Sequence, residues 1–239
     1  MSLKYDMKAT TILIVRHNKE VVIGADSQGT IGSYIANDNV NKIRTFRDKS
    51  ICMGFAGVAK DGIALFETLE GVLKMYNYNL QRACFEIAKK HREPTSIGRE
   101  AVVLIANNDH TFRFTGSGEL TRAEDVCSVG SGSSYALSAA KALLQHASHL
   151  SAKEIVEIAM NIAGKSCAYT NLNIKIEVIN PKPAPDKRSV LPKSDLPREV
   201  GIATDKIEKT TKATVKKTVR KTVRKVNKKK EVSNEKKNT

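Results

Sequence analysis

Runs of β-branched and other apolar residues, separated by short polar turns, open the chain. Residues 11–16 and 20–25 are two such runs, and the polar triplet at 17–19 between them is typical of a hairpin turn. Residues 43–46 and 50–55 repeat the arrangement across a second polar triplet. The pattern therefore predicts two β-hairpins near the start of the chain.

Helical spacing replaces this pattern farther on. Apolar residues recur every three or four positions over 63–76 and again over 80–91, which predicts two packed amphipathic helices. Strands at 101–106 and 111–115 follow around an Asn-rich turn, and a short strand is predicted at 126–129. The middle of the chain thus alternates a helix pair with strands.

A second helix pair and a final strand complete the pattern. Residues 135–147 are rich in Ala and Leu, and Ser151 with Glu154 forms a capping box for a helix that runs to about residue 163. Residues 172–178 alternate between apolar and polar positions, as a strand with one polar face does.

Strands that arrive in hairpins and helices that arrive in pairs define the fold class. This order argues against a doubly wound parallel sheet and favours antiparallel sheets flanked by helix pairs, an α+β architecture. The pattern alone leaves open whether the strands form one sheet or two.

Composition changes near residue 180. All Phe and Tyr residues precede that point, whereas residues 180–239 hold 19 Lys+Arg against 7 Asp+Glu and five of the six prolines. Because a core needs aromatic and branched apolar bulk, we expect one globular domain over 10–179, followed by a Pro-containing linker and a disordered basic tail. The charge of the tail favours nucleic acid or acidic surfaces as partners, with nonspecific, salt-sensitive binding because no aromatic residue is present to stack on bases.

Cysteine usage and hydropathy bear on the compartment. The cysteines are widely spaced and form no CxxC pair, so reduced thiols are expected rather than a disulfide framework. No secretory signal and no apolar run of ~18 residues is present. The sequence therefore predicts a soluble cytoplasmic protein without a membrane span.

Three side chains at strand edges carry candidate chemistry. Asp26 follows Thr10 by 16 positions, and Lys42 follows Asp26 by another 16. A Thr hydroxyl is a weak nucleophile that needs a base, and if Thr10 became the first residue its own α-amine, which titrates near ~8, would supply one. Lys42 would lower the pKa of that amine, and Asp26 would hold Lys42 charged and in place. Thr11 is a rival nucleophile.

Seven short motifs, taken in order, resemble the HslV (ClpQ) family, the peptidase subunits of a two-component bacterial ATP-dependent protease. The resemblance covers about 170 of the 239 residues. The motifs are Thr10-Thr11-Ile12, Gly24-x-Asp26-x-Gln28, Asn39-Val40-x-Lys42-Ile43, Gly54-Phe55-Ala56-Gly57, Leu65-Phe66-Glu67, Gly130-Ser131-Gly132 and Tyr169-Thr170-Asn171.

The resemblance implies a fold and a set of site residues. The fold is the four-layer αββα sandwich of N-terminal nucleophile hydrolases, in which two antiparallel sheets lie between helix layers. Thr10 corresponds to the catalytic threonine, and Asp26 and Lys42 to its supporting charge pair. Ser131 corresponds to the serine that hydrogen-bonds near the threonine amine, and Gly54 to the source of the oxyanion N–H.

The resemblance also implies a bound ion and a processing step. Gly164, Cys167 and Thr170 match the segment whose backbone carbonyls hold a monovalent cation, usually assigned as sodium. Residues 1–9 are expected to be a propeptide that self-cleavage removes at Ala9–Thr10, which creates the free amine.

The partners implied by the family complete the prediction. The family assembles as two stacked six-membered rings, a closed chamber that degrades unfolded proteins under allosteric control by the hexameric ATPase HslU. ATP would bind only that partner, because this chain has no P-loop motif. Two alternatives stay open at this point: a proteasome-β-like hydrolase with another partner, and an unprocessed non-catalytic scaffold whose basic tail binds nucleic acid.

Overall fold

The computed structural model describes residues 10–91, 101–115 and 117–181, and the structural statements below concern these residues. The expected propeptide at 1–9, and all but the first two residues of the expected tail, lie outside the described residues. Their proposed roles therefore stay predictions.

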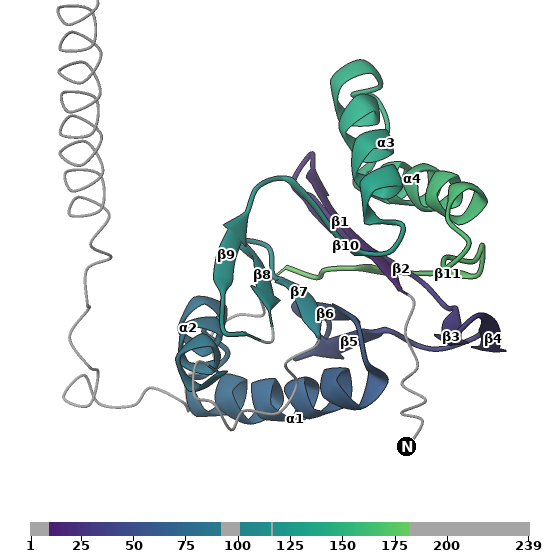
Figure 1. Ribbon diagram of the computed structural model, residues 1–239. Helices are drawn as coiled ribbons and strands as arrows, with labels where there is room; N and C mark the ends of the chain where they lie inside the picture. The colour runs from purple at the N-terminus through teal and green to yellow at the C-terminus, as the bar shows by residue number, and fades with distance from the viewer. Residues whose placement is uncertain (1–9, 92–100, 116, 182–239) are drawn as a thin grey trace, which may run out of the picture. The chain divides into compact units, whose positions relative to one another are not determined.

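Two antiparallel sheets face each other, and a helix pair covers the outer face of each (Figure 1). The first sheet has the strand order β10-β1-β2-β11, with β1 Thr11–His17, β2 Glu20–Asp26, β10 Val126–Gly130 and β11 Ile174–Val178. The second has the order β5-β6-β7-β8-β9, with β5 Ile43–Phe46, β6 Ile51–Ala56, β7 Val102–Ala106, β8 Thr111–Thr115 and β9 Leu120–Ala123. This is the four-layer αββα sandwich expected from the resemblance.

The helices pack in sequential pairs. They are α1 Ala59–Met75 and α2 Leu80–His91 on the second sheet, and α3 Ser133–His146 and α4 Ala152–Ser166 on the first. The capping box predicted at the start of α4 is confirmed, because Ser151 Oγ accepts from the Glu154 backbone N–H at 3.2 Å while the Glu154 carboxylate accepts from the Ser151 N–H at 2.8 Å.

Apolar residues on both faces of β1 place that strand between two cores. Ile12 and Ile14 pack toward the second sheet, whereas Leu13 and Val15 pack toward α3 and α4. Successive side chains of a strand point to opposite faces, so a strand that is apolar at every position is stable only when both faces are covered. The first sheet is therefore an internal layer.

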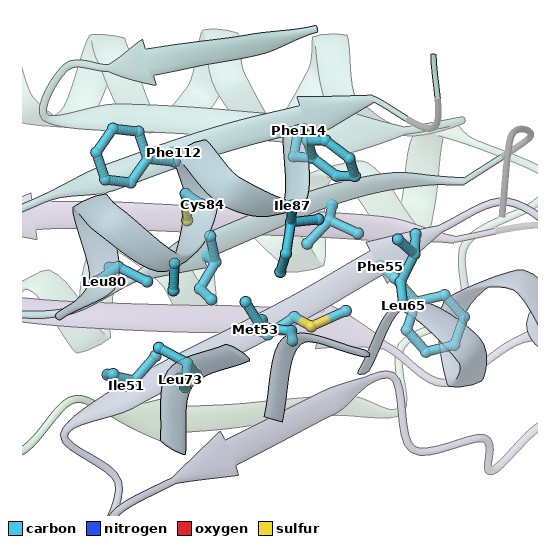
Figure 2. Packing of buried hydrophobic residues seen from close by; sticks show 14 of the residues in the cluster. Ile51, Met53, Phe55, Leu65, Leu73, Leu80, Cys84, Ile87, Phe112 and Phe114 are labelled. Atoms are coloured by element: carbon cyan, nitrogen blue, oxygen red, sulfur yellow. The ribbon is translucent and has the colours of Figure 1, made fainter. Parts of the chain in front are cut away.

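The outer core lies between the second sheet and its helices (Figure 2). Met53 and Phe55 project from β6 toward the helix layer, where Leu65 and Leu73 of α1 and Ile87 of α2 meet them. The apolar residues that recur at helical spacing in the sequence form the helix faces that are buried here.

Two short elements differ from the sequence-based expectation. The hairpin formed by β3 Gly29–Ile31 and β4 Tyr34–Asn37 was not predicted, and neither was β9. Every residue of β4 is exposed, and β9 is a four-residue strand at the edge of its sheet, so neither carries the apolar alternation that marks a half-buried strand. In addition, α3 begins at Ser133, two residues earlier than expected, and α4 continues to Ser166.

The cysteines and the helices bear on the predicted compartment. All four cysteines are free; Cys52 and Cys84 are buried, and burial raises the pKa of each of these two thiols to about 12. In the described part of the chain, the helices lack the combination of length and apolar character that crossing a membrane needs.

The approach of the two sheets at Gly54 gives a stability prediction. A Cβ at Gly54 would lie 2.7 Å from Ile12 Cγ2 and 3.2 Å from Ile23 Cδ1, so Gly54→Ala should lower the free energy of unfolding by about 1–3 kcal/mol through overpacking. Gly71→Ala is the matched control, because a Cβ there meets nothing within 4 Å on α1 and should stabilise the helix by up to about 1 kcal/mol. Urea midpoints of both variants test this, and a Gly54→Ala midpoint at or above the wild-type value would contradict it.

Candidate active site

The three predicted catalytic side chains come from two different sheets. Thr10 immediately precedes β1, and Asp26 is the last residue of β2. Because these strands are antiparallel, with Ile12 opposite Ala25, the start of β1 lies beside the end of β2. Lys42 immediately precedes β5 in the second sheet. The structure brings these residues together at one end of the sandwich.

A fully buried carboxylate organises this end. Asp26 Oδ1 accepts from the Thr11 backbone N–H at 2.6 Å and from Lys42 Nζ at 2.9 Å, while Oδ2 accepts from the Gln28 backbone N–H at 2.9 Å. The exposed fractions of the Asp26 and Lys42 side chains are 0% and 3%. A buried charge is tolerated when it is paired and hydrogen-bonded, and Asp26 meets both conditions.

Lys42 supplies positive charge beside the Asp26 oxygen that accepts from the amide after Thr10. Burial lowers the pKa of Lys42 below its ordinary value, although the charge and hydrogen bond of Asp26 oppose that shift. The ammonium and the Thr11 N–H share one carboxylate oxygen, and the Thr11 nitrogen is covalently bonded to the Thr10 carbonyl carbon. A positive charge at this place lowers the pKa of a neighbouring amine.

Residues 130 and 131 contact the carbonyl group of Thr10. The Ser131 N–H donates to Thr10 O at 2.8 Å, and Ser131 Oγ lies 3.3 Å from the same oxygen and 3.3 Å from Tyr169 O. Gly130 has a φ of +101°, and a Cβ there would overlap the Thr10 carbonyl. Ser131 therefore contacts Thr10 as expected, although through the carbonyl; its contact with the amine stays a prediction.

The rival nucleophile Thr11 is already engaged. Its hydroxyl accepts from the Gly132 N–H at 2.9 Å and lies 2.7 Å from Thr170 Oγ1. The residue is fully buried, with an exposed fraction of 0%. Its nitrogen donates to Asp26 Oδ1 as a backbone amide at 2.6 Å. The geometry favours Thr10 over Thr11.

Gly54 lies close to the site within the second sheet. It is buried in β6, opposite Ile43 and Leu104, and its Cα faces Ile12. Ile12 is two residues beyond Thr10, a distance of about 7 Å along a strand. The location is compatible with an oxyanion donor, and that role stays a prediction.

The predicted cation segment forms the end of α4 and the turn after it. Gly164 belongs to the last turn of α4, Cys167 is its C-cap, and the Thr170 N–H donates to Cys167 O at 3.1 Å. A Cβ at Gly164 would lie 2.9 Å from Asn171 O, so the turn closes tightly back on the helix. A helix end leaves its last carbonyls without intrahelical partners, and hard carbonyl oxygens suit a sodium ion, so the donor chemistry fits the ion.

Sequence reasoning missed some contributors to the site. Gln28 and Asn171 occur in the sequence motifs but were not predicted to be site residues. In the structure, the Gln28 backbone N–H donates to the Asp26 carboxylate, and the Asn171 side chain accepts from the N–H of Ser27. Their positions inside the same motifs as Asp26 and Thr170 were the only signal, because each contact has a backbone group as one partner, and backbone groups are common to all residue types.

A threonine before a central strand, a buried Asp–Lys pair beside it and an αββα sandwich define a threonine-type N-terminal nucleophile hydrolase. Comparisons with known proteins agree. Residues 7–179 match the family of proteasome subunits. The ATP-dependent protease subunit HslV of Cytophaga hutchinsonii is 41% identical over 171 residues, which are 71% of this chain and 95% of the relative. The HslV subunit of Amoebophilus asiaticus is 40% identical over 176 residues, 73% of this chain and 98% of the relative.

Solved structures support the same assignment. The crystal structure of eukaryotic HslV from Trypanosoma brucei superposes with a TM-score of 0.66 at 32% identity, covering 70% of this chain and 98% of that one. The chain belongs to the proteasome family and, within it, to the HslV peptidase subunits. It is therefore a threonine peptidase subunit of the ATP-dependent protease type, and the two alternative functions considered from the sequence are not favoured.

The buried ion pair gives a prediction with an internal control. Lys42→Ala leaves the Asp26 carboxylate buried without its counter-charge, so we expect destabilisation of about 3–5 kcal/mol and a loss of peptide hydrolysis of at least about 100-fold. Lys49→Ala breaks a second Lys–acid contact, 2.7 Å from Glu177, but half of the Lys49 side chain is exposed, so stability and activity should change little. Hydrolysis of a fluorogenic peptide and urea midpoints compare the two; retained activity in Lys42→Ala would remove Lys42 from the mechanism.

Proposed function

We propose that Thr10, once freed from residues 1–9, is the nucleophile that cleaves peptide bonds. The observation that carries the proposal is the buried Asp26–Lys42 pair, which shares the Asp26 oxygen with the amide that follows Thr10. The Thr10 α-amine takes the proton from Thr10 Oγ1 as this oxygen attacks the substrate carbonyl carbon. The Lys42 charge keeps part of the amine population unprotonated and stabilises the developing alkoxide.

The remaining steps follow from the same groups. The tetrahedral oxyanion would accept a hydrogen bond from the backbone N–H at Gly54. The protonated α-amine then donates its proton to the leaving amine, so the C–N bond breaks and an ester to Thr10 remains. A water molecule, deprotonated by the same amine, attacks the ester carbonyl and releases the second product.

Removal of residues 1–9 would use the same nucleophile but not the α-amine base, because the Thr10 nitrogen is still an amide in the precursor. In the precursor, the Thr10 hydroxyl oxygen would attack the Ala9 carbonyl carbon, and the Ala9–Thr10 C–N bond would break as the nitrogen takes up the hydroxyl proton. This leaves an ester on Thr10 Oγ1 and a free α-amine, and water then hydrolyses the ester and releases residues 1–9. The bonds from residue 131 to the Thr10 carbonyl support this step, because they fix the Thr10–Thr11 peptide and so the backbone that carries the attacking hydroxyl.

We further propose that the chain works in a closed double ring of hexamers with an HslU-type ATPase, which feeds unfolded chains to inward-facing sites. The relatives named HslV are subunits of ATP-dependent proteases, and this supports a ring oligomer and an ATPase partner. ATP would bind that partner. Cytoplasmic location and allosteric control by the ATPase stay predictions from the sequence.

A monovalent cation, sodium by the family resemblance, would sit on the carbonyls of Gly164, Cys167 and Thr170. Its contribution would be electrostatic, since it would hold the turn after α4 closed. Support comes from the hard-oxygen donor chemistry and the close return of the chain at Gly164.

Substitution of Thr10 tests the nucleophile. Thr10→Ala removes the hydroxyl, so we expect no self-cleavage and no peptide hydrolysis, while ring assembly is preserved. Thr10→Ser keeps a hydroxyl and should retain processing and measurable hydrolysis. Intact-mass measurement and N-terminal sequencing report processing, and a fluorogenic peptide reports activity. A wild-type chain that still begins at Met1 and is inactive would refute the proposal, as would an active Thr10→Ala variant.

The partner is tested on the processed wild-type chain. With an HslU-type ATPase and ATP, degradation of an unfolded protein should begin, and both should co-elute as a larger particle. The matched Thr10→Ala variant should still form that particle without degrading the substrate. Equal degradation with and without the ATPase would contradict the two-component model.

The basic tail supports a second interaction. The net charge of +12 over residues 180–239 favours nonspecific binding to nucleic acid. Mixed-sequence duplex DNA should bind the full chain at low salt and dissociate as salt is raised from about 50 to 200 mM. A chain ending at Pro181 should not bind, yet should hydrolyse peptides at the wild-type rate. A full chain that does not bind the DNA at low salt would refute this interaction.

A further inference from the structure

The turn at 167–171 contacts the segments that hold Thr10, Asp26 and Ser131. Thr170 Oγ1 lies 2.7 Å from Thr11 Oγ1, next to the nucleophile. Ala168 O accepts from Gln28 Nε2 at 3.0 Å, two residues beyond Asp26. Tyr169 O lies 3.3 Å from Ser131 Oγ. The turn therefore joins three chain segments that are far apart in sequence.

Asn171, at the end of this turn, makes a different connection. Its Oδ1 accepts from the Ser27 N–H at 3.0 Å, and its Nδ2 donates to Asp38 O at 2.9 Å. The Val40 N–H in turn donates to Ser27 O at 2.8 Å. These three hydrogen bonds close a ring that ties the residue after Asp26 to the loop that leads into Lys42.

We propose that Asn171 is a positioning residue that holds the Asp26 carboxylate and the Lys42 ammonium in register, an inference that rests on the proposed function. Asp26 ends a strand of the first sheet, whereas Lys42 reaches it from a loop before the second. Hydrogen bonds between these two segments therefore limit their relative motion. The side-chain amide of Asn171 binds both segments. Its Oδ1 accepts from the Ser27 N–H, and its Nδ2 donates to the Asp38 carbonyl.

A small displacement has a large effect here. The Lys42–Asp26 contact is a single charge-assisted hydrogen bond of 2.9 Å between two buried side chains. Misplacement of a supporting group by about 1 Å can cost about 100-fold in rate. Without Asn171, the Lys42 loop keeps the bonds from Val40 to Ser27 and from Asn173 to Asp38, but the link between Asp38 and Ser27 is lost, so the ammonium can shift relative to Thr10.

Asn173 provides a matched control. Its Nδ2 also donates to Asp38 O, at 3.2 Å, and lies 3.4 Å from Asn39 Oδ1. It is the same residue type, lies two positions farther along the segment that leads into β11, and binds the same carbonyl. Within the described residues, Asn171 accepts a hydrogen bond from Ser27, whereas Asn173 does not. Removing Asn173 should loosen the loop without separating it from the Asp26 segment.

The test compares Asn171→Ala with Asn173→Ala in the processed, assembled protein. For Asn171→Ala, kcat for a fluorogenic peptide should fall by about 10-fold or more with little change in KM, because substrate binding is intact and the reacting groups are misplaced. The rate at which a peptide vinyl sulfone labels Thr10 should fall by a similar factor. For Asn173→Ala, both rates should stay within about 3-fold of wild type, since the Ser27 bond persists.

Different results would overturn the role of Asn171 and the proposed function. Asn171→Ala rates equal to those of Asn173→Ala, or a rise in KM with unchanged kcat, would overturn the role of Asn171. Wild-type protein that begins at Thr10 but neither hydrolyses the peptide nor reacts with the vinyl sulfone would instead refute the proposed function. Urea midpoints check that both alanine variants fold. Asn171→Ser, whose short hydroxyl reaches only one of the two partners, should show the same selective loss of kcat if Asn171→Ala proves insoluble.

Discussion

The buried Asp26 carboxylate is the interaction on which the rest of the site depends. It accepts hydrogen bonds from Thr11, Gln28 and Lys42 and is fully excluded from solvent. A carboxylate in such a place is costly unless every contact is made, so the end of β2, the start of β1 and the loop before β5 are fixed relative to one another. Thr10, the candidate nucleophile, is held in place because the Asp26 carboxylate must be satisfied by the N–H of the next residue.

This dependence explains why the two sheets must pack closely. Asp26 lies on the first sheet and Lys42 at the edge of the second, so the ion pair exists only if the apolar layer between the sheets keeps its spacing. Gly54 contributes to that spacing, because Ile12 occupies the volume that a side chain would fill. Core packing and catalytic geometry are thus set by the same contacts.

The helix layer on the first sheet also takes part in the site. Residues 130–132 lead into α3, and the turn at 167–171 leaves α4; both ends of this helix pair return to Thr10 and Thr11. Backbone and side-chain hydrogen bonds from these turns surround the nucleophile strand. A helix pair that covers the sheet therefore also delivers the groups that orient Thr10, which links the fold directly to the chemistry of a threonine peptidase.

The sequence by itself determined the main elements and singled out Thr10, Asp26 and Lys42 as the candidate catalytic residues. Apolar periodicity located the long strands and all four helices, since a buried face must repeat at the period of its element. The motif order around Thr10, Asp26 and Lys42 indicated the family. The short β3–β4 hairpin was missed because an exposed strand such as β4 leaves no hydrophobic pattern. Only the tertiary structure decided whether one sheet or two forms, which atoms satisfy Asp26, and that Asn171 bridges Ser27 and Asp38. These features rest on backbone groups that every residue possesses, and on contacts between residues more than a hundred positions apart, so residue types alone do not encode them.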